Sequence, residues 1–446
     1  MPGASDPTSV STKQQRIAEL ARQMPDKAMT SLSHHIDLDW MLEAYRRTRK
    51  DGATGIDGQT AEDYQVNLEG NLKDLLDRAK SGDRYKAPPV RRVYIPKSDG
   101  SSRPLGIPTF EDKILQRTAV MALVPLYEQD FLDCSYGFRP KRSAHQALEV
   151  IWNNLMDMGG GWVLDVDIRQ YFNCLNHTYL REILAKRMQD GVITRLIGKW
   201  LNAGVWEDGV ISHPDEGTPQ GGVVSPVLSN IYLHEVLDTW FENVVKPYLK
   251  GKGFMVRFAD DFVMGFARKE DAERVMAVLP KRFEKYGLTL HPEKTRMLDF
   301  RTPALRRRPE EADGPIPFDF LGFTHYWAKS RKGYWVIKRK TSGKRLTRAI
   351  HKIKDWCRAN RHRPVKEQQT TMRQKMQGHY NYYGITGNAH ALGQFRHQVE
   401  LIWCRWLSRR SQRAYLGWAA FERLLKRFPL PLDRVVHSIH RQAANP

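Results

Sequence analysis

Two adjacent aspartates, Asp260 and Asp261, interrupt an apolar run that extends over residues 254–267. The residues on either side have the composition of two short strands, and the pair falls where a tight hairpin would turn. Adjacent carboxylates at a buried turn repel each other and lose hydration, a cost that a paired cation or a bound metal offsets. Most Asp-Asp pairs are solvated turns, but the hydrophobic flanks here favour a metal site.

A third carboxylate strengthens this interpretation. Residues 163–168 alternate like a strand and carry Asp165 and Asp167 on one face. One alternative is an edge strand with a solvated acidic face. The other is that Asp167 ends its strand beside the Asp-Asp turn, where the three carboxylates and the backbone carbonyl of Ile168 hold two Mg²⁺ ions. Mg²⁺ prefers such oxygen ligands, and two of these ions clamp the attacking and leaving oxygens of an in-line phosphoryl displacement.

Five short motifs follow in an order that resembles the palm of a reverse transcriptase. They are Asp-Ile-x-x-x-Phe from residue 167, Pro-Gln-Gly from 219, Phe-Ala-Asp-Asp from 258, His-Pro-Glu-Lys-Thr ending at 295 and Phe-Leu-Gly-Phe ending at 323. The second motif lies in a Gly- and Pro-rich loop that suits close packing of backbone against a base pair. Any one motif could arise by chance, but the ordered set is specific.

The flanking sequence resembles one branch of that family, the reverse transcriptases of bacterial group II introns. Three motifs resemble parts of the fingers of these proteins: Val93-Tyr-Ile-Pro-Lys97, Arg103-Pro-Leu-Gly-Ile-Pro108 and Tyr136-Gly-Phe-Arg-Pro140. A fourth, Gly55-Ile-Asp-Gly58, resembles part of their N-terminal extension, and a fifth, Gly378-His-Tyr-Asn-Tyr-Tyr383, resembles part of their maturase or X region. The resemblance covers roughly residues 40 to 440. It implies an α/β (α+β) fold, a right-hand polymerase with fingers and palm followed by an α-helical thumb/maturase (X) domain.

The expected domains are a polar lead over 1–35, an N-terminal extension with fingers over 36–159, a palm with the Asp triad over 160–327, a helical thumb/maturase (X) domain over 328–411, and a small basic segment over 412–446 that is a candidate for DNA binding. Helical patterning within the thumb predicts helices near 346–360, 365–382 and 393–407. The stretch 301–317, rich in Arg, Pro and Glu, is expected to be an exposed loop.

The resemblance also implies roles for individual residues. Lys97 and Arg103 flank a predicted hairpin tip and would grip the triphosphate of an incoming dNTP, although exposed hairpin cations are commonly idle. Phe172 would block a ribose 2′-hydroxyl, and it could equally be a core aromatic. Gln220 and Gly221 would belong to a loop that faces the template. Lys294 would protonate or neutralise the leaving pyrophosphate, and Leu321 and Gly322 would form the primer grip.

Positive charge is concentrated at the C-terminal end of the chain. The formal net charge is +21, and residues 328–446 contain 27 Lys and Arg against 5 Asp and Glu, while residues 1–327 are almost neutral. A solvated basic face is the ordinary explanation of a charge run. An excess this large, with so few acids and with Trp and Tyr interleaved, instead favours neutralisation of nucleic-acid phosphates.

Several features are missing from the sequence. No apolar run is long enough for a transmembrane helix, the N-terminus lacks the apolar stretch of a signal peptide, and four scattered cysteines form no CxxC motif. A bacterial, cytoplasmic and nucleoid-associated protein without a membrane partner is expected. No Cys- and His-rich cluster occurs up to Pro446, so the chain resembles the endonuclease-lacking kind of intron-encoded protein. Its DNA primer would then come from elsewhere, for instance a replication fork.

The leading hypothesis is an RNA-directed DNA polymerase that also binds its group II intron RNA, assists splicing and copies the intron during retrohoming. Its partners would be that RNA, an RNA template with a DNA primer, target DNA and dNTPs; no oligomeric state is predicted. One alternative is an RNA-binding splicing factor without polymerase activity, which the intact aspartates and fingers cations disfavour. Another is a related reverse transcriptase recruited to defence, which the maturase-like motif disfavours. An RNA-dependent RNA polymerase is disfavoured by Phe172.

Overall fold

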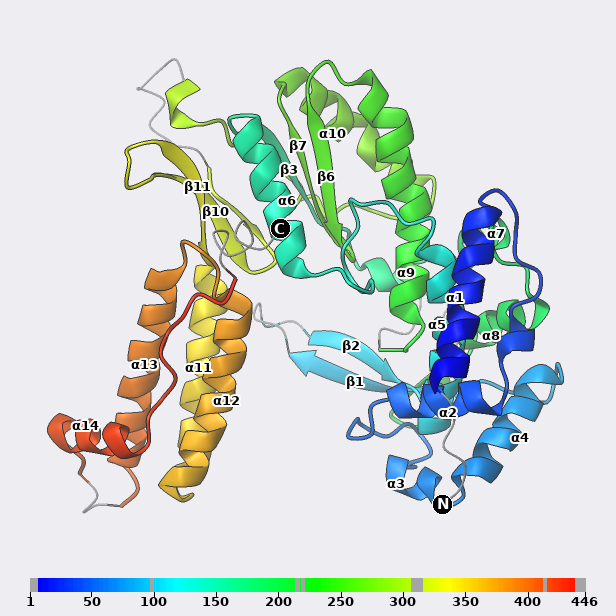
Figure 1. The fold of residues 1–446 in the computed structure, drawn as a ribbon, viewed down its shortest axis with the longest axis horizontal. Helices are drawn as coiled ribbons and strands as arrows, with labels where there is room; N and C mark the ends of the chain where they lie inside the picture. The colour runs from blue at the N-terminus through cyan, green and yellow to red at the C-terminus, as the bar shows by residue number, and fades with distance from the viewer. Residues whose placement is uncertain are drawn as a thin grey trace. The chain divides into compact units, whose positions relative to one another are not determined.

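Figure 1 presents the computed structural model of the chain, which describes residues 7–96, 100, 102–212, 217, 221–305, 316–411 and 415–437. The fold is mixed α/β, and a helical region follows it toward the C-terminus. The chain divides into two compact units, one made of residues 1–147 and 163–297 and the other of residues 148–162 and 298–446. Across the described residues, no helix combines the length and the apolar composition needed to cross a membrane.

The first unit contains a mixed sheet in the strand order β2-β1-β4-β5. Strands β1 (Val90–Pro96) and β2 (Ser102–Ile107) form an antiparallel hairpin in which Ile95 lies opposite Arg103, which confirms the predicted hairpin. Strand β1 pairs in parallel with β4 (Val205–Glu207), and β4 turns back into β5 (Val210–Ser212). Before β1 the chain forms helices α1 (Pro7–Gln23), α2 (Leu38–Arg47), α3 (Ala61–Gln65) and α4 (Leu68–Lys80). Between β2 and β4 this unit contributes helices α5 (Phe110–Tyr127), α7 (His177–Ala185) and α8 (Gly191–Leu201).

A second sheet has the order β6-β7-β3-β8. Strands β6 (Gly253–Phe258) and β7 (Asp261–Phe266) form its hairpin, β3 (Trp162–Val166) lies beside β7, and β8 (Arg296–Asp299) is at the far edge. Helix α10 (Lys269–Glu284) packs on β7 through a buried stripe at helical spacing, Val275, Leu279 and Phe283. Phe283 stacks on Phe262 of β7 with ring centroids 6.0 Å apart. Helix α9 (Ser225–Leu233) follows the Gly-rich loop and continues into two π-helical turns, His234–Asp238 and Phe241–Val245.

The second unit combines a small antiparallel sheet with a helical bundle (Figure 1). The sheet order is β11-β10-β9, and the bundle confirms the three predicted helices to within a few residues. Residues at helical spacing, among them Met372, Met376 and Tyr380, form one buried core between the helices. The elements are β9 (Phe318–Phe320), β10 (Phe323–Lys329), β11 (Trp335–Thr341), α11 (Gly343–Asn360), α12 (Val365–Tyr383), α13 (Ala389–Leu407) and α14 (Trp418–Arg427).

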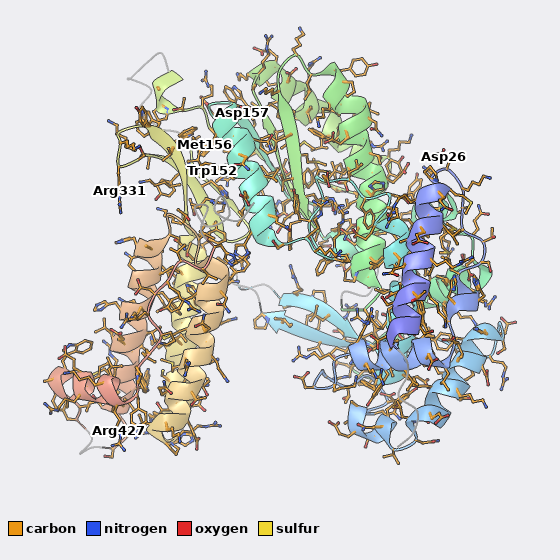
Figure 2. The ribbon with its side chains drawn as sticks, viewed as in Figure 1. Asp26, Trp152, Met156, Asp157, Arg331 and Arg427 are labelled. Atoms are coloured by element: carbon orange, nitrogen blue, oxygen red, sulfur yellow. The ribbon has the colours of Figure 1, made fainter. Side chains whose placement is uncertain are left out.

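Helix α6 (Ala144–Asp157) lies against β11 in the second unit. Figure 2 shows Trp152 and Met156 one helical turn apart on this helix, beside the strand. The Trp152 indole donates to the Ile337 carbonyl at 2.8 Å, and the Ile337 N–H donates to the Met156 sulfur at 3.3 Å. Most of the predicted exposed loop, residues 306–315, lies outside the described residues.

Candidate active site

The two adjacent aspartates occupy a two-residue hairpin turn, as the sequence predicts. Phe258 pairs with Asp261 across β6 and β7, so Ala259 and Asp260 form the turn itself. Ala259 has φ +58°, a left-handed conformation that costs a non-glycine residue about 1–2 kcal/mol. The surrounding structure must therefore hold this turn in place.

A buried arginine provides much of that hold. Arg257 and Asp238 are both fully buried, and the Arg257 guanidinium donates to the two Asp238 carboxylate oxygens at 2.7 and 2.6 Å. It also donates to the Asn230 side-chain oxygen and to the Ala259 carbonyl, each at 2.9 Å. Arg257 thus connects helix α9 and its π-helical extension directly to the backbone of the turn. The sequence analysis missed this network, although a charged residue inside an apolar strand was a signal that a buried partner exists.

The motif Tyr136-Gly-Phe-Arg-Pro140 packs on the other side of the turn. The Arg257 N–H donates to the Cys134 carbonyl at 2.7 Å, and the Tyr136 N–H donates to the Arg257 carbonyl at 2.9 Å. The Asn230 side-chain amide donates to the Gly137 carbonyl at 2.7 Å. A Cβ on Gly137 would collide with the Ala259 backbone, so only glycine permits this approach.

Carboxylates and cations of the first unit gather near the turn. Burial raises the pKa of Asp260, the Asp167 charge raises it further, and the charge of Arg103 on β2 lowers it. Asp167 is bound by Lys294, whose Nζ lies 2.9 Å from its carboxylate. Asp165, which lies two residues earlier within β3, pairs instead with Arg296 at 3.0 Å. Asp261 is exposed at the start of β7.

The predicted metal ligands do not form a ready-made cluster. Among the residues that the structure describes, no three Asp, Glu, His or Cys side chains converge closely enough to hold an ion. Within this arrangement the Asp167 carboxylate is paired with the Lys294 ammonium group. The backbone is nevertheless compatible with the predicted ligand Ile168. Ile168 forms an antiparallel bridge with Leu290, and the hydrogen bonds of this bridge are made by the Arg169 N–H and the Asp167 carbonyl. The Ile168 carbonyl takes no part in these bonds. The metal assignment of Asp167, Ile168, Asp260 and Asp261 remains a prediction.

Two more predicted residues lie in this unit. Phe172 is half-buried in a short 3₁₀ turn, Tyr171–Asn173, and meets the Tyr171 ring edge-on at a centroid distance of 5.3 Å. Gly221 has φ +123°, and a Cβ there would lie 2.6 Å from the Gly106 carbonyl oxygen of β2. The Gly-rich loop therefore touches the backbone of the β1–β2 hairpin. Lys97 and Gln220 fall outside the described residues, so their predicted roles have no structural account.

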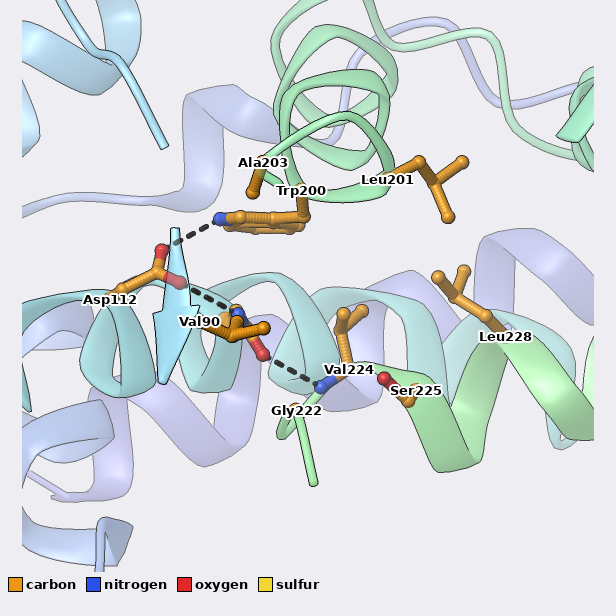
Figure 3. Close-up of a pocket in the computed structure, with 10 residues that line it drawn as sticks. Val90, Asp112, Trp200, Leu201, Ala203, Gly222, Val224, Ser225 and Leu228 are labelled. Atoms are coloured by element: carbon orange, nitrogen blue, oxygen red, sulfur yellow. Dashed lines mark hydrogen bonds between the residues drawn. The ribbon is translucent and has the colours of Figure 1, made fainter. Parts of the chain in front are cut away.

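A buried polar network fixes the end of the Gly-rich loop (Figure 3). The Gln116 side-chain oxygen of α5 accepts from the Val223 and Val224 N–H groups at 2.7 and 3.2 Å. The Gln116 amide donates to Asp112 at 2.8 Å, and the Trp200 indole of α8 donates to the same carboxylate at 2.7 Å. Tyr85 also donates to Asp112. Burial raises the pKa of Asp112 to about 6 despite these three donors. No local sequence signal pointed to this network.

The predicted primer grip lies in the second unit. Leu321 and Gly322, with φ +49° and +81°, form the two-residue turn between β9 and β10. The Tyr382 hydroxyl donates to the Leu321 carbonyl at 2.8 Å, and the Ser342 N–H donates to the Gly322 carbonyl at 2.9 Å. Because Tyr382 belongs to the maturase-like motif on α12, that motif holds the turn in its conformation.

Known proteins are similar to this chain in sequence. A profile of the family described as "Reverse transcriptase (RNA-dependent DNA polymerase)" matches residues 95–325, more than half of the chain. Protein YkfC of Escherichia coli (strain K12) is 36% identical over 289 residues, which cover 57% of this chain and 75% of YkfC. Group II intron-encoded protein LtrA of Lactococcus lactis subsp. cremoris is 36% identical over 228 residues, which cover 50% of this chain and 37% of LtrA. Nuclear intron maturase 2 of Arabidopsis thaliana is 27% identical over 281 residues, which cover 51% of this chain and 37% of that protein. The chain belongs to the reverse transcriptase (RNA-dependent DNA polymerase) family, in the group that includes proteins encoded by group II introns.

Proposed function

We propose that this reverse transcriptase extends a DNA primer on an RNA template by two-metal nucleotidyl transfer, with an N-terminal extension and fingers over residues 36–159, a palm over 160–327 and a thumb/maturase (X) domain over 328–411. The primer 3′-oxygen forms a bond to the α-phosphorus of a dNTP, the bond from that phosphorus to the bridging oxygen breaks, and pyrophosphate leaves. Two Mg²⁺ ions, when bound, would stabilise the attacking and leaving oxygens. Asp167, Asp260, Asp261 and the Ile168 carbonyl are the ligands in this proposal.

The observation that carries the proposal is the charge arrangement at the hairpin turn. Burial disfavours ionisation of Asp260 and raises its pKa, the Asp167 charge adds to that effect, and the Arg103 charge opposes it, so a bound cation would further stabilise the ionised carboxylate. Hard divalent cations suit such a set of oxygen ligands. Lys294, whose Nζ lies 2.9 Å from the Asp167 carboxylate, is the side chain that would neutralise or protonate the leaving pyrophosphate.

Substitution of Asp167 tests the site, and the same substitution of the nearby Asp165 is a matched control. Asp167→Asn should lower Mg²⁺-dependent primer extension by at least about 100-fold, because a ligand charge of the metal clamp is lost. Asp165→Asn, two residues earlier in the chain but paired with Arg296, should stay within a few-fold of wild type. Extension by Asp167→Asn within tenfold of wild type, with a normal melting temperature, would contradict the metal assignment.

We also propose that a group II intron RNA is the template and splicing partner, as the relatives encoded by such introns suggest. Support comes from the excess of 27 Lys and Arg over 5 Asp and Glu in residues 328–446. The logarithm of the RNA-binding constant should fall with the logarithm of salt by roughly 0.7–0.9 per phosphate contact. Charge reversal at the exposed Lys352 or Arg363 should reduce that slope and leave extension of a saturating primer–template intact. An unchanged slope in both variants would move the RNA site to the first unit.

A further inference from the structure

Phe138 is an exposed aromatic residue in a strained backbone conformation. Its side chain is 59% exposed, although the residues on both sides of it, Gly137 and Arg139, are buried. Its φ is +58°, which is unusual for any non-glycine residue and is an outlier for a bulky one. Such strain persists only where the surroundings fix the conformation, and it concentrates at functional sites.

The surroundings of Phe138 do fix it. The Arg139 guanidinium donates to Glu128 at 3.0 Å, to the Leu132 carbonyl at 2.6 Å and to the Ser135 carbonyl at 2.9 Å. On the other side, Gly137 is held by the Asn230 amide and fits closely against the backbone of Ala259. The Phe138 ring is therefore presented to solvent from a rigid segment that rests on the Asp260 turn.

A cation accompanies the ring. Lys141, three residues later, is exposed and also has a left-handed backbone, with φ +60°. An exposed aromatic ring and an exposed cation within three residues of each other form a combination with which proteins bind single-stranded nucleic acid, the ring stacking on a base and the cation contacting a phosphate. Folding alone gives no reason to place Phe in a strained, exposed position where glycine would be unstrained.

We propose that Phe138 is a stacking platform for a nucleobase at the edge of the catalytic turn, with Lys141 contacting a neighbouring phosphate. The base comes from either of two sources, the primer–template or the incoming dNTP. The inference rests on the proposed function, since it takes the Asp260 turn as the site of nucleotidyl transfer.

Three substitutions at this position separate stacking from folding. Phe138→Ala should weaken binding of an RNA-template/DNA-primer duplex, or raise the KM for dNTP, by about 5- to 150-fold, the range expected for one lost stacking contact. Phe138→Trp keeps an aromatic face and should retain binding. Phe138→Gly removes both the ring and the strain, so its melting temperature should equal or exceed that of wild type while binding falls as in Phe138→Ala. Tyr248→Ala is a matched control, because Tyr248 is an aromatic residue of the first unit that is 76% exposed.

Duplex binding is measured by fluorescence anisotropy without dNTP, and KM by steady-state extension at saturating duplex. A weaker Kd assigns the base to the primer–template, and a raised KM with unchanged Kd assigns it to the incoming nucleotide. Unchanged Kd and unchanged KM in a folded Phe138→Gly variant would overturn the proposal. The anisotropy arm needs no catalysis, so it is informative even if Asp167→Asn shows that the metal assignment is wrong.

Discussion

Replacement of Arg257 should affect stability and catalysis in separable ways. Arg257 and Asp238 form an ion pair with both side chains at 0% exposure. Arg257→Met leaves Asp238 as a buried carboxylate without its main partner, which typically costs about 3–5 kcal/mol of unfolding free energy. Since domains are typically stable by only about 5–15 kcal/mol, the single variant should be markedly destabilised.

The double variant Arg257→Met/Asp238→Leu removes both charges and should recover most of that loss, because well-packed apolar residues replace a buried ion pair at little or no net cost. It does not restore the hydrogen bond from Arg257 to the Ala259 carbonyl at 2.9 Å. The left-handed turn that carries Asp260 therefore stays poorly held. Misplacement of a reacting group by about 1 Å can lower the rate by about 100-fold, so kcat for extension should remain low in the refolded double variant.

A double-mutant cycle compares wild type, Arg257→Met, Asp238→Leu and the double variant. Urea denaturation of these four proteins gives the coupling free energy between Arg257 and Asp238, which should exceed about 2 kcal/mol. Primer extension at saturating dNTP gives kcat. A double variant as unstable as Arg257→Met would show that the ion pair is not the main role of these residues. A stable double variant with wild-type kcat would refute the conclusion that Arg257 positions the turn.

Two further predictions concern residues near the same site. Burial raises the pKa of Asp112 to about 6 in the folded chain. Its protonated form therefore stabilises the fold fully below about pH 4, and this contribution is lost as the pH rises through 6. The unfolding free energy of Asp112→Asn relative to wild type should rise by about 3 kcal/mol between pH 4 and pH 7, and a flat difference in urea titrations would contradict the buried carboxyl. Phe172→Val should increase ribonucleotide incorporation relative to deoxynucleotides in single-nucleotide extension assays; unchanged sugar selection in a folded variant would make Phe172 a packing residue.

Local patterns predicted the parts of the fold that depend on local contacts. The apolar flanks of Asp260 and Asp261 predicted the β6–β7 hairpin, and the turn before Arg103 predicted the β1–β2 hairpin. The 3.6-residue periodicity after residue 343 predicted α11, α12 and α13. These elements are determined by residues within one strand pair or one helix, so a single sequence is enough to locate them.

The residues that hold the site could not be predicted in the same way. Arg257 reaches Asp238 and Asn230, 19 and 27 residues earlier, and Trp200 reaches Asp112 across 88 residues. Those partners lie on helices whose packing no periodicity specifies. The contact between Lys294 and Asp167 could not be predicted either. The family motif implied only that Lys294 acts at the leaving group, and the structure adds that it pairs with Asp167. The sequence motifs thus predicted which residues do chemistry, and the long-range contacts show what positions the turn that carries Asp260.

The two adjacent aspartates differ in environment, and this difference yields a last prediction. Asp260 lies in the turn, half-buried, with its pKa raised first by burial, whereas Asp261 is exposed at the start of β7. A carboxyl with a raised folded pKa stabilises the fold at low pH and loses that contribution as the pH rises through the folded value. At neutral pH without Mg²⁺, Asp260→Asn should therefore melt at a higher temperature than wild type, and Asp261→Asn should melt close to wild type.

Added Mg²⁺ should reverse the order of wild type and Asp260→Asn. An ion that binds only the folded state raises its stability by mass action, and wild type keeps the carboxylate that such an ion needs. Asp260→Asn lacks that charge and should gain little from Mg²⁺ in a melting series with Ca²⁺ and Na⁺ controls at matched ionic strength. Equal Mg²⁺-dependent shifts in wild type and Asp260→Asn would mean that the turn does not bind the ion, and that the burial of Asp260 serves packing instead of metal-dependent catalysis.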